Sequence, residues 1–486
     1  MTGAVPVFLK PTRNHFGIIG PIPKSEFEPA TIEAKIKANP LLKGVDAKSV
    51  KPRILTLTQS TYDGVLYNTE TIKAMLDGYV ESLHFDEAWL PHAAFHPFYY
   101  SYHAMGKHHA RPKQSVVYAT QSIHKLLAGI SQASHVLVQD SENTKLDHHL
   151  FNEAYLMHTS TSPQYSIIAS CDVAAAMMEP PGGTALVEES ITESLNFRRA
   201  MRKVDDEYGK DWWFKVWGPD TLLEEGLGKA EDWIIRSDGR STKNGSKWHG
   251  FGQLADGFNM LDPIKATVVT PGLNLDGKFD KSGLPASIVT KYLAEHGVVV
   301  EKTGLYSFFI MFTIGITKGR WNTLLTALQQ FKDDYDKNQP MWRVMPEFCK
   351  KQPRYERMGL RDLCQFIHEM YAKYDIARLT TEMYLSDLTP AMKPSDAYAH
   401  IAQRKTERVE IDQLEGRVTV GLVTPYPPGI PLLIPGEVFN RKIVDYLKFA
   451  REFNEQCPGF ETDIHGLVEA VAADGKKHYY ADCVKA

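Results

Sequence analysis

The chain has 486 residues, 43% of them hydrophobic and 23% charged, which are ordinary values for a soluble globular protein. Its net charge of −4 gives no electrostatic reason to expect nucleic acid or an anionic membrane as a partner. The most apolar run, LYSFFIMFTIGIT from Leu305, is shorter than the about 20 residues that a membrane span needs. The five scattered cysteines form no CxxC pattern, so we expect no disulfide framework and a cytoplasmic location.

The first third of the chain alternates between strand-like and helix-like segments. The predicted strands are 53–58, 115–120 and 135–140, and the predicted helices are 71–83, 146–160 and 167–178. This alternation favours βαβ units and an α/β fold with a mostly parallel sheet. In such sheets, ligands bind beyond the carboxyl ends of the strands.

Three domains are predicted along the chain. Pro and Gly in EPPGG, from Glu179, end a helix and indicate a boundary, so the first domain is 1–179. The segment 180–338 mixes a charged helix with strands such as KATVVTPG and predicts a smaller α+β domain. The segment 339–486 has two long helical stretches followed by strand-like runs, and predicts a C-terminal α+β domain.

Polar residues follow the predicted strands where a ligand would bind. Asp86 follows SLHF, and Ser122 and Lys125 follow SVVYAT. A lysine amine becomes a nucleophile toward carbonyls when desolvation lowers its pKa. A neighbouring carboxylate can keep a pyridine nitrogen protonated, which makes the ring an electron sink. Most lysines are solvated surface residues, but Lys125 together with Ser122 and Asp86 favours a site for pyridoxal 5'-phosphate (PLP).

The segment SIHK, followed by SQAS, resembles the PLP-lysine signature of the bacterial ornithine/lysine/arginine decarboxylases. Other segments resemble this family in the family's order, from Pro11 to Gly466, and so cover nearly the whole chain. They include PTRNHFGIIGPI, STYDG, FDEAW, WHGF, LDPIK, GVVVEKTGLYSF and PGFETDIHG. The resemblance implies the PLP-dependent transferase fold of type I, with the first domain being part of the large, PLP-binding domain.

The resemblance also implies a role for individual residues in the cofactor site. Lys125 matches the lysine that holds PLP covalently, and Asp86 matches the carboxylate that pairs with the pyridinium. Ala88 would pack on one face of the ring, Trp89 would approach the phenolic oxygen, and Ser122 would lie at the phosphate.

Three further residues receive roles from the same resemblance. His124 would also lie at the phosphate and belong to the catalytic group. Ser160, in HTSTSP, matches a hydroxyl that reaches the phosphate of a neighbouring subunit, which implies a homodimer with shared sites and leaves a higher oligomer open. Glu301, in VVVEKTG, matches a position that contacts the distal cation of the substrate, and a carboxylate suits that cation.

The implied reaction is PLP-dependent loss of CO2 from a basic amino acid. FDEAW, STSPQY and EKTGLYSF look most similar to lysine-preferring members, so L-lysine is the expected substrate and cadaverine the product. Arginine is the alternative, because ITKGRW and the CVKA ending resemble acid-induced arginine enzymes, and ornithine stays possible. Each turnover consumes a proton, which implies acid tolerance or polyamine supply as the physiology.

The start of the chain departs from the family pattern. The family has an upstream segment with a phosphate-binding GTS loop and a histidine that stacks on the PLP ring, and neither motif is found here. We therefore expect an N-terminally truncated member with only the later part of the large domain. The alternative function is a non-catalytic remnant or interaction subunit of the same family.

Several residues have an ordinary structural interpretation beside a functional one. His92 and His96 are four residues apart, but no HExxH glutamate accompanies them, so packing is favoured and no metal is predicted. Asp63 in STYDG is either a turn former or a cofactor contact. Glu301 is either a surface carboxylate or the substrate contact.

Overall fold

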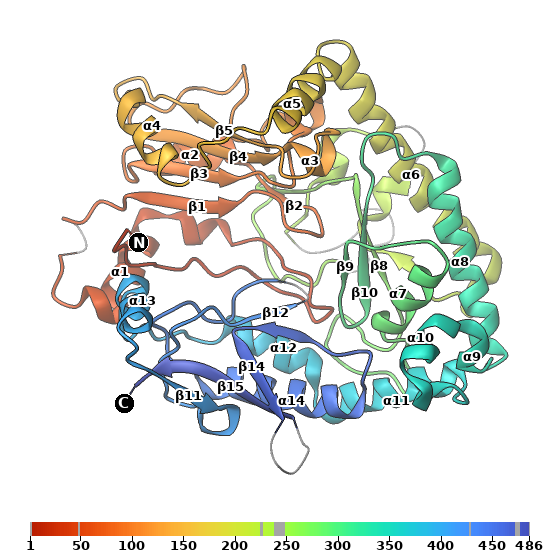
Figure 1. Cartoon of the computed structure of the whole chain (residues 1–486). Coiled ribbons are helices and arrows are strands. Elements are labelled where there is room, and N and C mark those ends of the chain that lie inside the picture. The colour runs from red at the N-terminus through yellow and green to blue at the C-terminus, as the bar shows by residue number, and fades with distance from the viewer. Residues whose placement is uncertain are drawn as a thin grey trace.

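The computed structural model describes residues 2–485 except 47–48, 224–226, 238–247, 427–428 and 472–476. A first sheet lies at one end of the molecule, a second sheet at its centre, and the C-terminal helices and strands at the opposite end (Figure 1). The long helices α6 (Gly182–Tyr208) and α8 (Lys318–Asp336) run along one side between these regions. None of the described helices is both long and apolar enough to cross a bilayer.

The first sheet has the strand order β1-β3-β4-β5. Three of its strands, β1 (Ile54–Thr58), β3 (Ser82–Asp86) and β4 (Val116–Ser122), are parallel. The predicted strand 135–140 forms β5 (Ser134–Gln139) and pairs antiparallel with β4, so the sheet is mostly parallel, as predicted. The reason for the antiparallel direction is the connection, because a parallel return requires a crossover of about a dozen residues.

The helix predicted over 71–83 is shorter than expected. It forms α2 (Thr69–Leu76), whose first turn is capped by the Asn68 side chain, which accepts the Thr71 N–H at 2.9 Å. The chain turns at Asp77, whose carboxylate accepts a backbone N–H from the loop before β4, and at Gly78, which has a φ of +79°. The turn frees the following residues to form β3.

The central sheet has the order β6-β8-β10-β9 and is antiparallel in every pairing described. Its strands are β6 (Lys215–Val216), β8 (Lys265–Val269), β10 (Ser307–Met311) and β9 (Lys302–Thr303). The short strands β2 (Val65–Tyr67) and β7 (Asn259–Leu261) pair antiparallel and join the first sheet to this central region.

The C-terminal region packs helices against a small antiparallel sheet of order β11-β15-β14. That sheet consists of β11 (Thr406–Glu410), β15 (Lys477–Val484) and β14 (Leu467–Val471). The other described helices and strands are α1 (Pro29–Ala38), α3 (Ile123–Leu126), α4 (His148–Leu156), α5 (Tyr165–Met177), α7 (Ala286–Glu295), α9 (Met341–Val344), α10 (Pro346–Lys351), α11 (Leu360–Lys373), α12 (Ile376–Leu385), α13 (Pro394–Ala402), α14 (Arg441–Gln456), β12 (Thr424–Tyr426) and β13 (Asp463–His465).

Two groups of buried side chains form the core. A smaller one, including Phe27, Leu83 and Phe85, packs α1 and α2 against the first sheet. A larger one extends through the central sheet and the C-terminal helices, and includes Phe308 and Val444. The C-terminal helices are therefore continuous in packing with the central region, and the domain boundaries at 179/180 and 338/339 stay predictions.

Replacing Phe85 by Ala is expected to lower the free energy of unfolding by about 3–5 kcal/mol, because the ring is 0% exposed and leaves a cavity beneath β3. Urea unfolding monitored by circular dichroism measures the change. Val299→Ala is the control, since Val299 is 86% exposed and should change stability by less than about 0.5 kcal/mol. A loss at Phe85 no larger than that of the control would contradict this account of the core.

Candidate active site

The predicted site lies at the carboxyl ends of the three parallel strands β1, β3 and β4. Thr58 of β1 pairs in register with Asp86 of β3, which pairs with Thr120 of β4. The short helix α3 follows β4 at once and carries His124 and Lys125. The register thus brings the predicted carboxylate of β3 next to the segment that holds the predicted lysine.

Asp86 is held at the end of β3 by local hydrogen bonds. Its Oδ1 accepts the Ala88 N–H at 3.1 Å and the Thr120 hydroxyl at 3.5 Å. On the same face, Nε2 of His84 lies 3.2 Å from the Thr120 hydroxyl oxygen. Burial lowers the pKa of His84, and the Asp86 carboxylate opposes this shift. A neutral imidazole and a carboxylate therefore flank one threonine.

Lys125 lies over an aromatic ring. Its Nζ is 4.2 Å from the centroid of the Trp89 ring, and this ring packs edge-on against Tyr62 with centroids 5.1 Å apart. Burial lowers the pKa of the Lys125 amine, while the carboxylates of Asp86 and Glu301 oppose the shift. A half-buried amine of lowered pKa provides more of the unprotonated nucleophile than a surface lysine does.

The two residues predicted to bind the phosphate of PLP, His124 and Ser122, lie beside this lysine in the chain. Nδ1 of His124 donates to the Ala133 carbonyl at 2.9 Å, and the His124 backbone N–H points to the same carbonyl at 3.2 Å. This bond leaves Nε2 of His124 available to a ligand. The Ser122 hydroxyl is half-buried and is hydrogen-bonded to none of the residues that the structure describes.

Of the other two predicted site residues, Glu301 interacts with Lys125 and Ser160 does not within the described part of this chain. Glu301 is exposed directly before β9, and its backbone N–H donates to the Phe309 carbonyl at 3.0 Å. Its charge opposes the lowering of the Lys125 pKa. Ser160 is exposed between α4 and α5, and its hydroxyl accepts the Ser162 N–H at 3.1 Å. No described contact joins Ser160 to Lys125 within this chain.

Asp63 has a role that neither sequence interpretation anticipated. It is buried, accepts the Thr267 hydroxyl at 2.6 Å, and forms an ion pair with Lys302. Lys302 also lies 5.8 Å from the centroid of the Tyr62 ring. The sequence signal was the family-like STYDG and EKTG segments, but a pairing across more than two hundred residues cannot be read from either one.

A second lysine near the site is fully buried. Lys265 of β8 donates to the Ser60 hydroxyl and lies 3.6 Å from the Asp262 carboxylate. Burial lowers its pKa to about 8, and the Lys125 charge contributes to the lowering while Asp262 opposes it. The LDPIK segment resembles the family but gives no sign of this role, because a buried lysine has no distinctive sequence pattern.

The paired histidines belong to the core. His92 lies 3.3 Å from the Asp262 carboxylate and packs edge-on against Tyr99, and His96 accepts the Phe98 N–H at 3.3 Å. Among the described residues, no group of three or more His, Cys, Asp or Glu side chains is arranged to hold a metal ion.

Two models of one protein family match this chain, one over its first two thirds and one over its C-terminal part. The model described as "Orn/Lys/Arg decarboxylase, major domain" matches residues 1–320, and the model for the C-terminal domain of the same family matches residues 377–485. The chain belongs to the Orn/Lys/Arg decarboxylase family. The resemblance seen in the SIHK and FDEAW segments is thereby confirmed.

Individual members of the Orn/Lys/Arg decarboxylase family match along the whole chain. Lysine decarboxylase LdcA of Pseudomonas aeruginosa is 47% identical over 100% of this chain and 64% of its own length. The inducible lysine decarboxylase of Escherichia coli K12 is 40% identical over 98% of this chain and 63% of its own length. The chain therefore spans less than two thirds of these relatives.

A solved structure, lysine decarboxylase A from Pseudomonas aeruginosa, has the same fold. It superposes with a TM-score of 0.92 at 47% identity, covering 100% of this chain and 64% of that chain. The predicted α/β fold class of the PLP-dependent transferase type I is confirmed. Relatives named arginine and ornithine decarboxylase match at the lower identities of 37% and 30%.

Glu87, directly after Asp86, predicts a pH effect on stability. It is buried, accepts the Ala104 N–H and the Gln121 amide, and burial raises its pKa to about 7. Because the folded pKa exceeds the unfolded one, the stabilisation is complete in acid and is lost as the pH rises toward 7. Relative to Glu87→Gln, the unaltered chain should lose about 2–3 kcal/mol of unfolding free energy between about pH 5 and about pH 8.

Urea unfolding of both chains at several pH values measures this difference. Glu142→Gln is the control, since Glu142 is exposed and its replacement should leave the pH dependence as it is. Identical pH profiles for Glu87→Gln and the unaltered chain would exclude a buried Glu87 that takes up a proton near neutrality.

Proposed function

We propose that this chain catalyses PLP-dependent decarboxylation of a basic amino acid, with L-lysine as substrate and cadaverine and CO2 as products. The carrying observation is the Lys125 amine, which lies 4.2 Å from the Trp89 ring, has a pKa lowered by burial, and is within the field of Asp86 and Glu301. Lysine is favoured because the most similar of the relatives described above are named lysine decarboxylases. Arginine is the runner-up and ornithine the third candidate.

The side chains present fit PLP. Lys125 offers a desolvated amine for the aldehyde carbon, and Asp86 a carboxylate for the pyridine nitrogen. The Ser122 hydroxyl and Nε2 of His124 are not engaged by described residues and suit the phosphate. When bound, PLP accepts the electron pair released as the bond between Cα and the carboxylate breaks.

The protein's own part is binding, orientation and proton control. Ala88 would pack on one face of the cofactor ring, and Trp89 would approach its phenolic oxygen. Asp86 would hold a proton on the pyridine nitrogen, because a carboxylate favours the charged form of a neighbouring base. Glu301 would bind the distal ammonium of lysine by charge-assisted hydrogen bonds, which orients Cα above the cofactor.

We further propose a homodimer that shares its sites across an interface at α4 and α5. Ser160 lies between these helices, exposed and without a described contact to its own Lys125. Large apolar side chains are exposed around it, as expected of a protein–protein contact. They are Leu150, Tyr155, Leu156, Met157, Tyr165, Ile168 and Val173, with Tyr165 77% exposed.

The same exposed surface favours the second candidate function, a non-catalytic interaction subunit of the family. The two candidates differ in whether Lys125 takes up PLP. A cytoplasmic location is proposed with either, since all five cysteines are free thiols in the structure and a reducing compartment keeps them so.

Borohydride reduction of the chain incubated with PLP should fix a pyridoxyl group on Lys125, because its amine is less protonated than that of a solvated lysine. Peptide mapping by mass spectrometry locates the group. Lys125→Ala should abolish both the label and CO2 release from L-lysine, while Lys107→Ala, at an exposed lysine, should keep both. A label on another lysine would refute the assignment, and an unlabelled, inactive chain would favour the interaction subunit.

Glu301→Gln should raise the KM for L-lysine about 10-fold to 100-fold and change kcat less, because it removes a charge-assisted contact made in both ground and transition states. Initial rates with lysine, arginine and ornithine measure the effect and rank the three substrates. Glu188→Gln, at an exposed glutamate of α6, is the matched control. An unchanged KM would show that Glu301 is a surface carboxylate that does not contact the substrate.

A further inference from the structure

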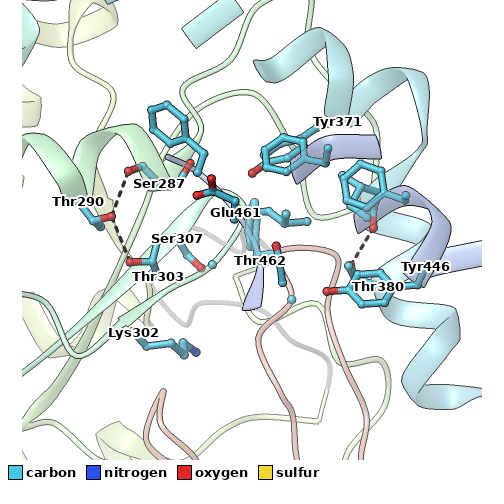
Figure 2. Close-up of a pocket in the computed structure, with 18 of the residues that line it drawn as sticks. Ser287, Thr290, Lys302, Thr303, Ser307, Tyr371, Thr380, Tyr446, Glu461 and Thr462 are labelled. Carbon is cyan, nitrogen blue, oxygen red and sulfur yellow. Dashed lines mark hydrogen bonds between the residues drawn. The ribbon is translucent and has the colours of Figure 1, made fainter. Parts of the chain in front are cut away.

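A cavity of about 250 Å³, whose lining includes none of Asp86, Trp89, Lys125 and Glu301, lies where three parts of the chain meet. Its walls come from the N-terminal segment around Arg13, from α7 and β9 of the central region, and from the C-terminal helices α11, α12 and α14. Figure 2 shows the hydroxyl groups of Ser287, Thr290 and Thr303 on one side of this space and those of Tyr371 and Tyr446 on the other.

Arg13 brings an unpaired charge to this cavity. Its guanidinium carbon lies 4.6 Å from the centroid of the Tyr384 ring, and its Nε is sealed from solvent without a hydrogen-bond partner. No described residue forms an ion pair or a hydrogen bond with the guanidinium. The side chain as a whole is half-buried. A partly desolvated guanidinium stays charged, so it gains free energy from an anion that reaches it.

The other cations around the cavity already have carboxylates near them. Lys302 forms an ion pair with Asp63, which also accepts a hydrogen bond from Thr267. Burial lowers the pKa of Lys291, and the charge of Glu461 opposes this shift. Neither Lys291 nor Arg13 has a carboxylate in direct contact among the described residues. The wall carries the cations Arg13, Lys291 and Lys302, of which Asp63 pairs with one and Glu461 offsets another, so one further negative charge would balance the site.

The rest of the wall suits an apolar body rather than a highly charged one. The Thr303 hydroxyl donates to that of Thr290 at 3.1 Å, and the Thr380 hydroxyl donates to the Ile376 carbonyl at 2.8 Å. The Ser287 hydroxyl faces that of Tyr371 and opposes the rise that burial causes in the pKa of Tyr371. Aromatic rings form much of the remaining surface, namely Phe449, Phe453, Phe460, Tyr371, Tyr384 and Tyr446.

We propose that this cavity is a binding site for a small monocarboxylate with an aromatic or apolar body, whose carboxylate pairs with Arg13 and whose body lies on the aromatic wall. Size supports the proposal, because an apolar cavity of about 150 Å³ holds benzene. The larger volume here accommodates a ring with a carboxylate attached. Binding at this site requires neither PLP nor decarboxylation, so this proposal can be tested independently of the proposed function.

Benzoate and benzamide test the proposal, because they share a shape and differ in charge. Isothermal titration of the full chain should show benzoate binding with one site per chain and about 10-fold to 100-fold more tightly than benzamide, the range expected for one charge-assisted pair. Equal affinity for the two compounds, or no binding of benzoate at millimolar concentrations, would overturn it.

The variant Arg13→Met keeps the length of the side chain and removes its charge. It should abolish the preference for benzoate and leave the weak binding of benzamide unchanged. Arg320→Met, at an exposed arginine of α8, is the matched control and should keep the preference. A preference that survives in Arg13→Met would show that benzoate binds elsewhere. The comparison of the two compounds on the unaltered chain decides the matter if Arg13→Met does not fold.

Discussion

The ion pair between Lys302 and Asp63 joins the central sheet to the loop that follows β1 of the first sheet. Its two neighbours in the sequence face the candidate site, because Tyr62 packs on Trp89 with centroids 5.1 Å apart and Glu301 precedes Lys302. The Lys125 amine of α3 lies over the same indole. One buried pair thus links the strand that follows Glu301 to the loop whose Tyr62 contacts Trp89.

The positions of the strands and the chemistry at their ends could be predicted from local patterns, and long-range pairing could not. Alternating apolar segments and the polar residues after them were sufficient to place Asp86 and Lys125 near each other, because parallel strands end at one edge. The antiparallel direction of β5 could not be read from the strand pattern, since it depends on the length of a connection rather than on the strand itself. The end of α2 was mispredicted because an Asp77 side chain, bonded to a distant loop, stops the helix.

The residues that sequence reasoning missed are those whose role depends on burial. Lys265 and Asp262 sit three positions apart in LDPIK, which alone is compatible with a solvated pair on a strand end. Their significance comes from complete burial and from Ser60, a residue about two hundred positions away that accepts the lysine N–H. No sequence pattern encodes which polar residues are desolvated together, so such networks emerge only when the sheets are assembled.

The distribution of buried charge links the candidate site to the separate cavity. Asp63 neutralises Lys302 by direct contact, and its field also reaches Arg13, where it opposes the lowering of the pKa by burial. One carboxylate therefore serves two cations, and it contacts only one of them. Since an ion pair is strongest at direct contact, Arg13 would still be stabilised by an anion that contacts it. A charge that the fold leaves unbalanced at this point, beside a cavity with aromatic walls, is better explained by a ligand than by packing alone.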